Sequence, residues 1–274
     1  MIKAEGIVKH FGKLEILNGT DFEVGQGEVT LLLGRNGAGK TTLFNLLLGC
    51  LPLDGGRMTA LGLDSNRDYI AIRERTGYLP ESDTLYTDWT VADNIAFVSK
   101  FYKNWDDEME SKMAERFKLP LKQKVSTLNR GARRKLSMLL AFSHRAELYL
   151  LDEPLSGLDP IFREEILLSL IEAIQEKGGT FLISSHFVEE LENLATSAIF
   201  LNDGRVAAQG SADALRASYG ELTLADGQAV PESMQVLKET CLGDKRTVAG
   251  RWTGTGPAPF ETSLTLTEIF KRIC

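Results

Sequence analysis

Residues 34 to 42 form a glycine-rich loop with the composition of a phosphate-binding site, and the apolar run Val29–Leu33 comes directly before them. Glycines in such a loop let backbone N–H groups converge on a di- or triphosphate, and the helix that follows presents its positive N-terminal end to the same anion. Lys40 is expected to reach the β- and γ-phosphates, and the Thr41 hydroxyl to hold Mg²⁺. The predicted nucleotide-binding residues are Gly34, Arg35, Asn36, Gly37, Ala38, Gly39, Lys40, Thr41 and Thr42.

Two carboxylates end a second apolar run, Leu148-Tyr-Leu-Leu-Asp152-Glu153. If this run is a strand parallel to the first, both acids lie at the sheet edge beside the phosphate-binding loop. Asp152 is suited to hold Mg²⁺, directly or through water, and Glu153 to orient or deprotonate an attacking water. The alternative is a buried strand that ends in solvated acids.

Three further segments are expected at the same edge. His186 follows the apolar run Phe181–Ile183, and we interpret it as a γ-phosphate contact rather than a structural histidine. The segment Ser156-Gly157-Leu158-Asp159 follows the acidic pair, and Ser126–Ala132 lies upstream, at the start of a helix predicted over 133–142.

The elements that must position these residues follow from the apolar pattern. Almost wholly apolar strands at 148–151, 180–183 and 198–201 alternate with amphipathic helices, which indicates a parallel sheet covered on both faces. Asp159 and Pro160 are a good N-cap and first residue for one of these helices. The first 25 or so residues predict short antiparallel strands, and about 86–143 has helical spacing.

Composition bounds the cellular setting. The chain has 274 residues, 43% of them hydrophobic, and a net charge of −7, which argues against a general grip on nucleic acid. Its sequence has no stretch near the roughly 20 apolar residues that span a bilayer and no signal-peptide core at its start. Three widely separated cysteines, Cys50, Cys241 and Cys274, predict a reducing cytosol rather than disulfides or a zinc site.

A loop of the 34–42 type alone fits kinases, GTPases, helicases and transport ATPases, but the order of all these motifs is more specific. Residues 1 to about 210 resemble the nucleotide-binding subunit of ATP-binding-cassette (ABC) transporters. The resemblance implies an α/β P-loop NTPase fold with a mostly parallel sheet, an N-terminal antiparallel β subdomain and an inserted helical subdomain at about 86–145. Residues 211–274 would then be a C-terminal extension of unknown role, although 264–270 is similar to the short terminal helix of such subunits.

The same resemblance implies roles for particular residues. Two subunits would face head to tail, so that each ATP lies between the phosphate-binding loop of one and the signature segment of the other. Phe11 would stack on adenine, Glu153 would be the catalytic base, His186 would sense the γ-phosphate and Asp159 would couple the two sites. The implied cofactors are ATP and Mg²⁺, and the implied partners are an integral membrane subunit and a second ATP-binding subunit, expected to be another copy of this chain.

The chain departs from the family pattern at two places. Gly77–Glu81 matches a segment that normally ends in glutamine, so the Glu81 carboxylate stands where an amide would meet Mg²⁺ or the attacking water. The signature form Leu-Ser-Gly-Gly-Gln becomes Leu128-Asn129-Arg130-Gly131-Ala132. Asn129 and Arg130 retain the ability to donate to phosphate, and Gly131 keeps close backbone approach possible. The alternatives are that Glu81 and Arg130 point to solvent.

The predicted function is the ATP-hydrolysing subunit of an ABC transporter, acting through ATP-driven dimer closure on the cytoplasmic face of the cell membrane. Pro80-Glu81, Ser156–Pro160 and the extension beyond Gly204 are similar to ATPase subunits of small exporters. A solute-importer subunit is the nearest alternative. A soluble ABC-type ATPase or regulatory switch without a membrane partner is the alternative of another class.

Overall fold

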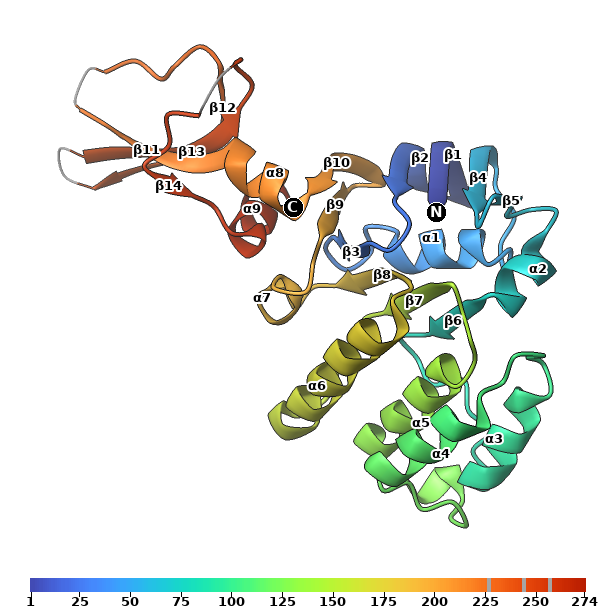
Figure 1. Ribbon diagram of the computed structural model, residues 1–274. Helices are drawn as coiled ribbons and strands as arrows, with labels where there is room; N and C mark the ends of the chain where they lie inside the picture. Colours follow the sequence, from blue (N-terminus) through green and yellow to red (C-terminus); the bar gives the residue numbers. More distant parts are fainter. Residues whose placement is uncertain (226–227, 243–244, 256–257) are drawn as a thin grey trace.

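A six-stranded sheet with the order β10-β9-β3-β8-β7-β6 forms the centre of the molecule. The computed structural model describes residues 1–225, 228–242, 245–255 and 258–274 (Figure 1). The strands are β3 (Val29–Leu33), β6 (Thr76–Leu79), β7 (Leu148–Asp152), β8 (Thr180–Ser185), β9 (Ser197–Asn202) and β10 (Arg205–Ser211). All pairings are parallel except that of β10 with β9. Every residue of β3, β7 and β8 is buried, as expected for strands covered on both faces.

A four-stranded antiparallel sheet lies at the N-terminal end, in the order β2-β1-β4-β5. Its strands are β1 (Ile2–Phe11), β2 (Leu14–Val24), β4 (Gly55–Ala60) and β5 (Leu63–Asp64), and the helices nearby are α1 (Lys40–Leu47) and α2 (Tyr69–Glu74). One apolar cluster joins residues of β1, of α1 and of the central strands, including Ile7, Phe44 and Leu150. Helix α1 is therefore packed between the two sheets, which fixes the loop at its N-terminus.

A group of helices is inserted between β6 and β7 and extends from one end of the molecule (Figure 1). It consists of α3 (Val91–Ser99), α4 (Asp107–Arg116), the 3₁₀ turn Val125–Thr127 and α5 (Arg130–Phe142), and α6 (Pro160–Lys177) follows β7. Helix α5 starts three residues earlier than the sequence predicts, because Asn129 Oδ1 accepts the Ala132 N–H at 2.8 Å. Asp159 caps α6 as predicted, accepting from the N–H groups of Ile161 and Phe162.

Residues beyond β10 form a third sheet that the sequence did not reveal, in the order β12-β13-β11-β14. The elements of this part are α8 (Ala212–Ser218), β11 (Tyr219–Leu224), β12 (Met234–Leu242), β13 (Lys245–Trp252), β14 (Thr262–Ser263) and α9 (Leu266–Ile273). The short helix α7 (Val188–Leu191) comes earlier, before β9. Helix α9 confirms the predicted terminal helix and contacts the central sheet, where Asn202 Nδ2 donates to Ile273 O at 3.3 Å. Residues 226–227, 243–244 and 256–257 of the predicted extension lie outside the described residues.

The predicted fold class is confirmed: an α/β protein with a mostly parallel sheet, N-terminal antiparallel strands and inserted helices. Among the described residues, no helix is both long and apolar enough to cross a membrane. The division at residue 210 stays a prediction.

Candidate nucleotide-binding and catalytic site

The loop between β3 and α1 has the backbone geometry that phosphate binding needs. Gly37 and Gly39 have φ of 84° and 104°, in the left-handed region that favours glycine. A Cβ at Gly39 would also lie 2.8 Å from Leu17 Cδ2, so the close packing of β2 against the loop excludes larger residues there. The Gly39 carbonyl accepts the Leu43 N–H at 2.9 Å, so α1 begins directly at the loop. Its free N–H groups therefore face the region where phosphates would bind.

Lys40, Glu153 and His186 form one connected cluster at the carboxyl edge of the central sheet. Lys40 Nζ lies 3.1 Å from Glu153 Oε1, and it also donates to Gly34 O at 2.7 Å. Glu153 Oε2 lies 2.8 Å from His186 Nδ1. The side chains of Lys40 and Glu153 are 7% and 5% exposed, whereas that of His186 is 35% exposed. The predicted base is thus held between two cationic or hydrogen-bonding groups.

Asp152 is fully buried beside this cluster, at the end of β7. Its Oδ1 accepts from Ser184 Oγ at 2.5 Å, while its Oδ2 has no hydrogen-bond partner in the described chain. Burial raises the pKa of this carboxyl, and the Ser184 and Thr41 hydroxyls act in the opposite direction. A buried carboxylate oxygen without a partner fits a cation ligand.

Mg²⁺ takes oxygen ligands and is usually held by one or two protein groups together with substrate phosphates. No group of three or more His, Cys, Asp or Glu residues in the described ranges could hold a metal ion alone. Asp152 Oδ2 and the nearby Thr41 hydroxyl suit the smaller protein share of such a site. The donor set therefore fits the Mg²⁺ predicted from the sequence.

A cavity of about 290 Å³ opens over the loop and the carboxylates. The described residues that line it are Ile16, Asn36, Gly37, Gly39, Lys40, Thr41, Thr42, Glu81 and Glu153. Glu81 thus lies beside the loop rather than turning wholly away from it. Ile16 was missed by the sequence reasoning, because an isoleucine in a strand gives no signal of ligand contact. Phe11 is half exposed at the end of β1 and is not among the lining residues, so its adenine contact stays a prediction.

The signature segment lies outside this cavity, as a role in a second subunit requires. The Gly131 position is closed by the Phe162 ring of α6, because a Cβ there would lie 2.7 Å from ring carbons. The Arg130 guanidinium is folded against Gly157 of the same chain, in the segment that ends at Asp159. Arg130 and Glu81 also line one cavity of about 450 Å³, so the two departures from the family pattern face a common space within one chain.

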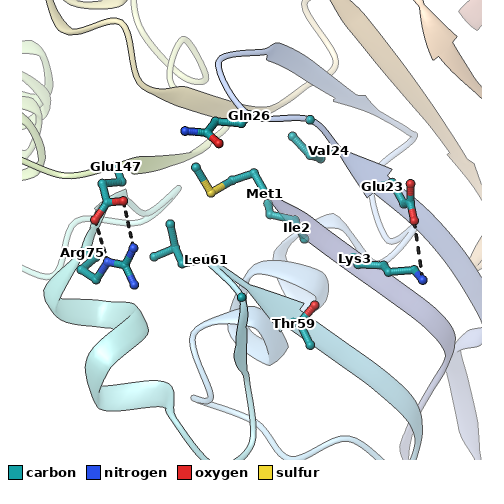
Figure 2. Close-up of a pocket in the computed structure, with 12 residues that line it drawn as sticks. Met1, Ile2, Lys3, Glu23, Val24, Gln26, Thr59, Leu61, Arg75 and Glu147 are labelled. Atoms are coloured by element: carbon teal, nitrogen blue, oxygen red, sulfur yellow. Dashed lines mark hydrogen bonds and ion pairs between the residues drawn. The ribbon is translucent and has the colours of Figure 1, made fainter.

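Another cavity, of about 490 Å³, is lined by none of these residues (Figure 2). It lies at the opposite edge of the central sheet, where Arg75 and Glu147 precede β6 and β7. Two hydrogen bonds of 2.6 and 2.9 Å join these side chains, so the charges of Arg75 and Glu147 on the wall of the cavity are already paired with each other. We assign it no role in nucleotide binding.

The fold and the site define a P-loop nucleotide-binding protein, and comparison with known proteins narrows the class. A model of the ABC transporter family matches residues 17–156. The chain is 31% identical over 229 residues to the linearmycin resistance ATP-binding protein LnrL of Bacillus subtilis, covering 82% of this chain and 73% of LnrL. It is 34% identical over 215 residues to the Nod factor export ATP-binding protein I of Bradyrhizobium diazoefficiens, covering 77% and 70%.

A solved ATP-binding subunit of an ABC transporter is similar with a TM-score of 0.71 and 26% identity, covering 79% of this chain and 92% of that one. The chain belongs to the ABC transporter family, in which it is an ATP-hydrolysing cassette subunit.

Proposed function

We propose that this chain hydrolyses ATP at sites shared between two copies and that the resulting closure drives export through a separate membrane subunit. The observation that carries the proposal is the cluster of Lys40, Glu153 and His186 beside the phosphate-binding loop. It supplies a phosphate-binding cation that lies 3.1 Å from the base and a ring nitrogen that hydrogen-bonds the base at 2.8 Å.

In the mechanism we propose, ATP binding opens this cluster. The phosphates accept hydrogen bonds from N–H groups of the loop and of the first turn of α1. Lys40 leaves Glu153 and binds the β- and γ-phosphates. Glu153 is then free to accept a proton from the attacking water, while His186 holds Oε2 and its other ring nitrogen faces the γ-phosphate. Bound Mg²⁺ supplies positive charge that stabilises the phosphates, and Asp152 and Thr41 would hold it, with Glu81 beside them.

The second copy completes each site in this proposal. Asn129 and Arg130 at the start of α5 are exposed and lie outside the nucleotide cavity of their own chain, so they are available to another, whereas Gly131 is buried against Phe162. Asn129 already uses its Oδ1 to cap α5, so its amide nitrogen is left to donate. Arg130 must leave Gly157 to reach a γ-phosphate, which ties its movement to the Asp159 segment.

A surface next to Glu81 supports a membrane partner. Four aromatic rings form one connected cluster, with the centroids of contacting rings 4.5 to 5.3 Å apart: Tyr86, Trp89, Phe97 and Phe101. Tyr86, Trp89 and Phe101 are 48%, 39% and 63% exposed, and Asp83 and Asp88 are exposed beside them. An exposed apolar patch rimmed by charge is typical of a protein interface. We propose that this surface holds the chain peripherally at the membrane.

Charge reversal at Asp88 tests that surface. Asp88→Lys is expected to lower recovery of the chain with the membrane fraction and to leave its ATP affinity unchanged. Lys3→Glu, on the far antiparallel sheet, is the control. Equal recovery of Asp88→Lys and wild type would contradict docking at this surface.

Export rather than import is supported by the Nod factor export protein among the relatives. Purified chain given MgATP is expected to release phosphate, and more so in complex with its membrane subunit. MgATP binding without hydrolysis in either preparation would instead favour the regulatory switch. Association of the complex with a solute-binding protein would favour the importer.

A further inference from the structure

A buried guanidinium that the mechanism above does not use lies between the two halves of the site. Arg134 is on the second turn of α5 and is 4% exposed. Its Nε donates to Pro154 O at 3.0 Å and its Nη1 to Pro80 O at 2.5 Å. Its Nη2 donates to Asp152 O at 3.0 Å and to Glu153 O at 2.9 Å. All four of these bonds go to main-chain carbonyls.

This cation is held without a carboxylate in direct contact. Burial lowers the pKa of Arg134 to about 10, and the charges of Asp83 and Asp152 act to raise it. The side chain therefore stays charged near neutral pH. Its planar fork of donors suits several acceptors at once, which a lysine ammonium on a single stem does not.

The bonds to the segment after β7 act where the backbone is strained. Glu153 has φ of +45°, a region that L-residues with side chains rarely adopt. Its N–H is bound by Ser184, at 2.9 Å to Oγ and 3.1 Å to the carbonyl oxygen. Arg134 binds the carbonyl on the other side of the same residue. The peptide groups before and after the Glu153 side chain are thus both fixed.

The bond to Pro80 acts on the other wall of the cavity. Pro80 immediately precedes Glu81, which lines the cavity together with Glu153. One guanidinium plane therefore sets the distance between the loop that carries Glu81 and the strand end that carries Glu153. The same side chain belongs to the helix whose first residues are Arg130 and Gly131.

From these contacts we infer that Arg134 is a positioning residue for ATP hydrolysis. It holds Glu81 and Glu153 at a fixed separation and links both to α5, the helix that begins in the signature segment of the same chain. The inference rests on the proposed role of Glu153 as base. Arg134 is not among the described residues that line the nucleotide cavity.

Substitution of Arg134 with a matched control tests the inference in the full chain. Arg134→Gln is expected to lower kcat about 100-fold, the usual effect of misplacing a catalytic group by about an ångström. Its KM for MgATP should stay within about twofold, because Arg134 makes no contact with the phosphate-binding loop. The control is Lys135→Gln, the next residue, a cation that is 7% exposed and pairs with Glu165 of α6 at 2.7 Å.

Equal losses of kcat in the two variants would overturn the inference, since both remove a buried cation from α5. Absence of MgATPase activity in the wild-type chain and its complex would instead refute the proposed function. Arg134→Lys keeps a buried charge but cannot join Pro80 to Pro154, so it should fold and still lose most of the activity. Full activity in Arg134→Lys would also overturn the inference.

Two further measurements separate positioning from stability. Hydrogen exchange should become faster at the amides of Glu153 and Ser156, which donate to Ser184 O and Glu153 O, in Arg134→Gln but not in Lys135→Gln. The effects of Arg134→Gln and Glu81→Ala on kcat should be less than additive, as for residues that act as one unit. Unchanged exchange at these amides, or additive effects, would contradict a coupling through Arg134.

Discussion

Replacing Glu153 with glutamine should change hydrolysis and ATP affinity in opposite directions. Loss of a general base lowers turnover by about 10² to 10⁴. Lys40 Nζ lies 3.1 Å from Glu153 Oε1 and both side chains are almost fully buried, so in the proposed mechanism ATP breaks this ion pair when Lys40 moves to the phosphates. Close charge pairs that are excluded from water contribute about 1.5 kcal/mol or more, and each 1.4 kcal/mol corresponds to tenfold in affinity. We therefore expect Glu153→Gln to bind ATP at least about tenfold more tightly.

The assay pairs phosphate release with calorimetric titration of the full chain by ATP. Glu147→Gln is the control, because Glu147 precedes the same strand at its other end and pairs with Arg75 (Figure 2). It should alter neither quantity. Normal turnover in Glu153→Gln would remove Glu153 from the role of base. Lost turnover with unchanged ATP affinity would show that ATP does not displace Lys40 from Glu153.

Three other substitutions test separate parts of the site. Asp152→Asn should raise the unfolding temperature of the chain without ATP above pH 4, because a carboxyl with a raised folded-state pKa destabilises the fold as pH rises. The same change should abolish stabilisation by MgATP. Thermal unfolding at pH 6 and 8, with and without MgATP, measures both effects. Gly131→Ala should cost about 1 to 3 kcal/mol by crowding Phe162, which denaturant unfolding measures. Arg130→Ala should slow turnover of the complex about tenfold without changing ATP binding to the monomer; wild-type turnover would leave Arg130 a surface residue.

The sequence predicts the central sheet and its edge because the signals there are local. An all-apolar run ending in Asp152 and Glu153 indicates both a buried strand and the exit of its side chains at one edge. The order of the motifs then places Lys40 near Glu153 although 113 positions separate their numbers in the chain. The helix cap at Asp159 is predictable for the same reason, since it depends on adjacent residues.

Long-range contacts account for what the sequence did not predict. Arg134 reads as one of several basic residues in a helix, and only the approach of Pro80 and Pro154 gives it partners. The fold of Arg130 onto Gly157 likewise depends on the path of two loops. The C-terminal sheet has strands with mixed burial, such as β11, in which alternation is too irregular to reveal a strand.

The place of β3 between β8 and β9 governs when the nucleotide site is completed during synthesis. The phosphate-binding loop leaves β3 near residue 34, yet the strands that flank β3 end only at Ser185 and Asn202. At about 5 to 20 residues per second, a ribosome needs on the order of 10 to 30 seconds to cover this interval. Until Ser185 is made, the strand Val29–Leu33 lacks both neighbours, so a nascent chain stalled before Ser185 should depend on chaperones and bind no ATP.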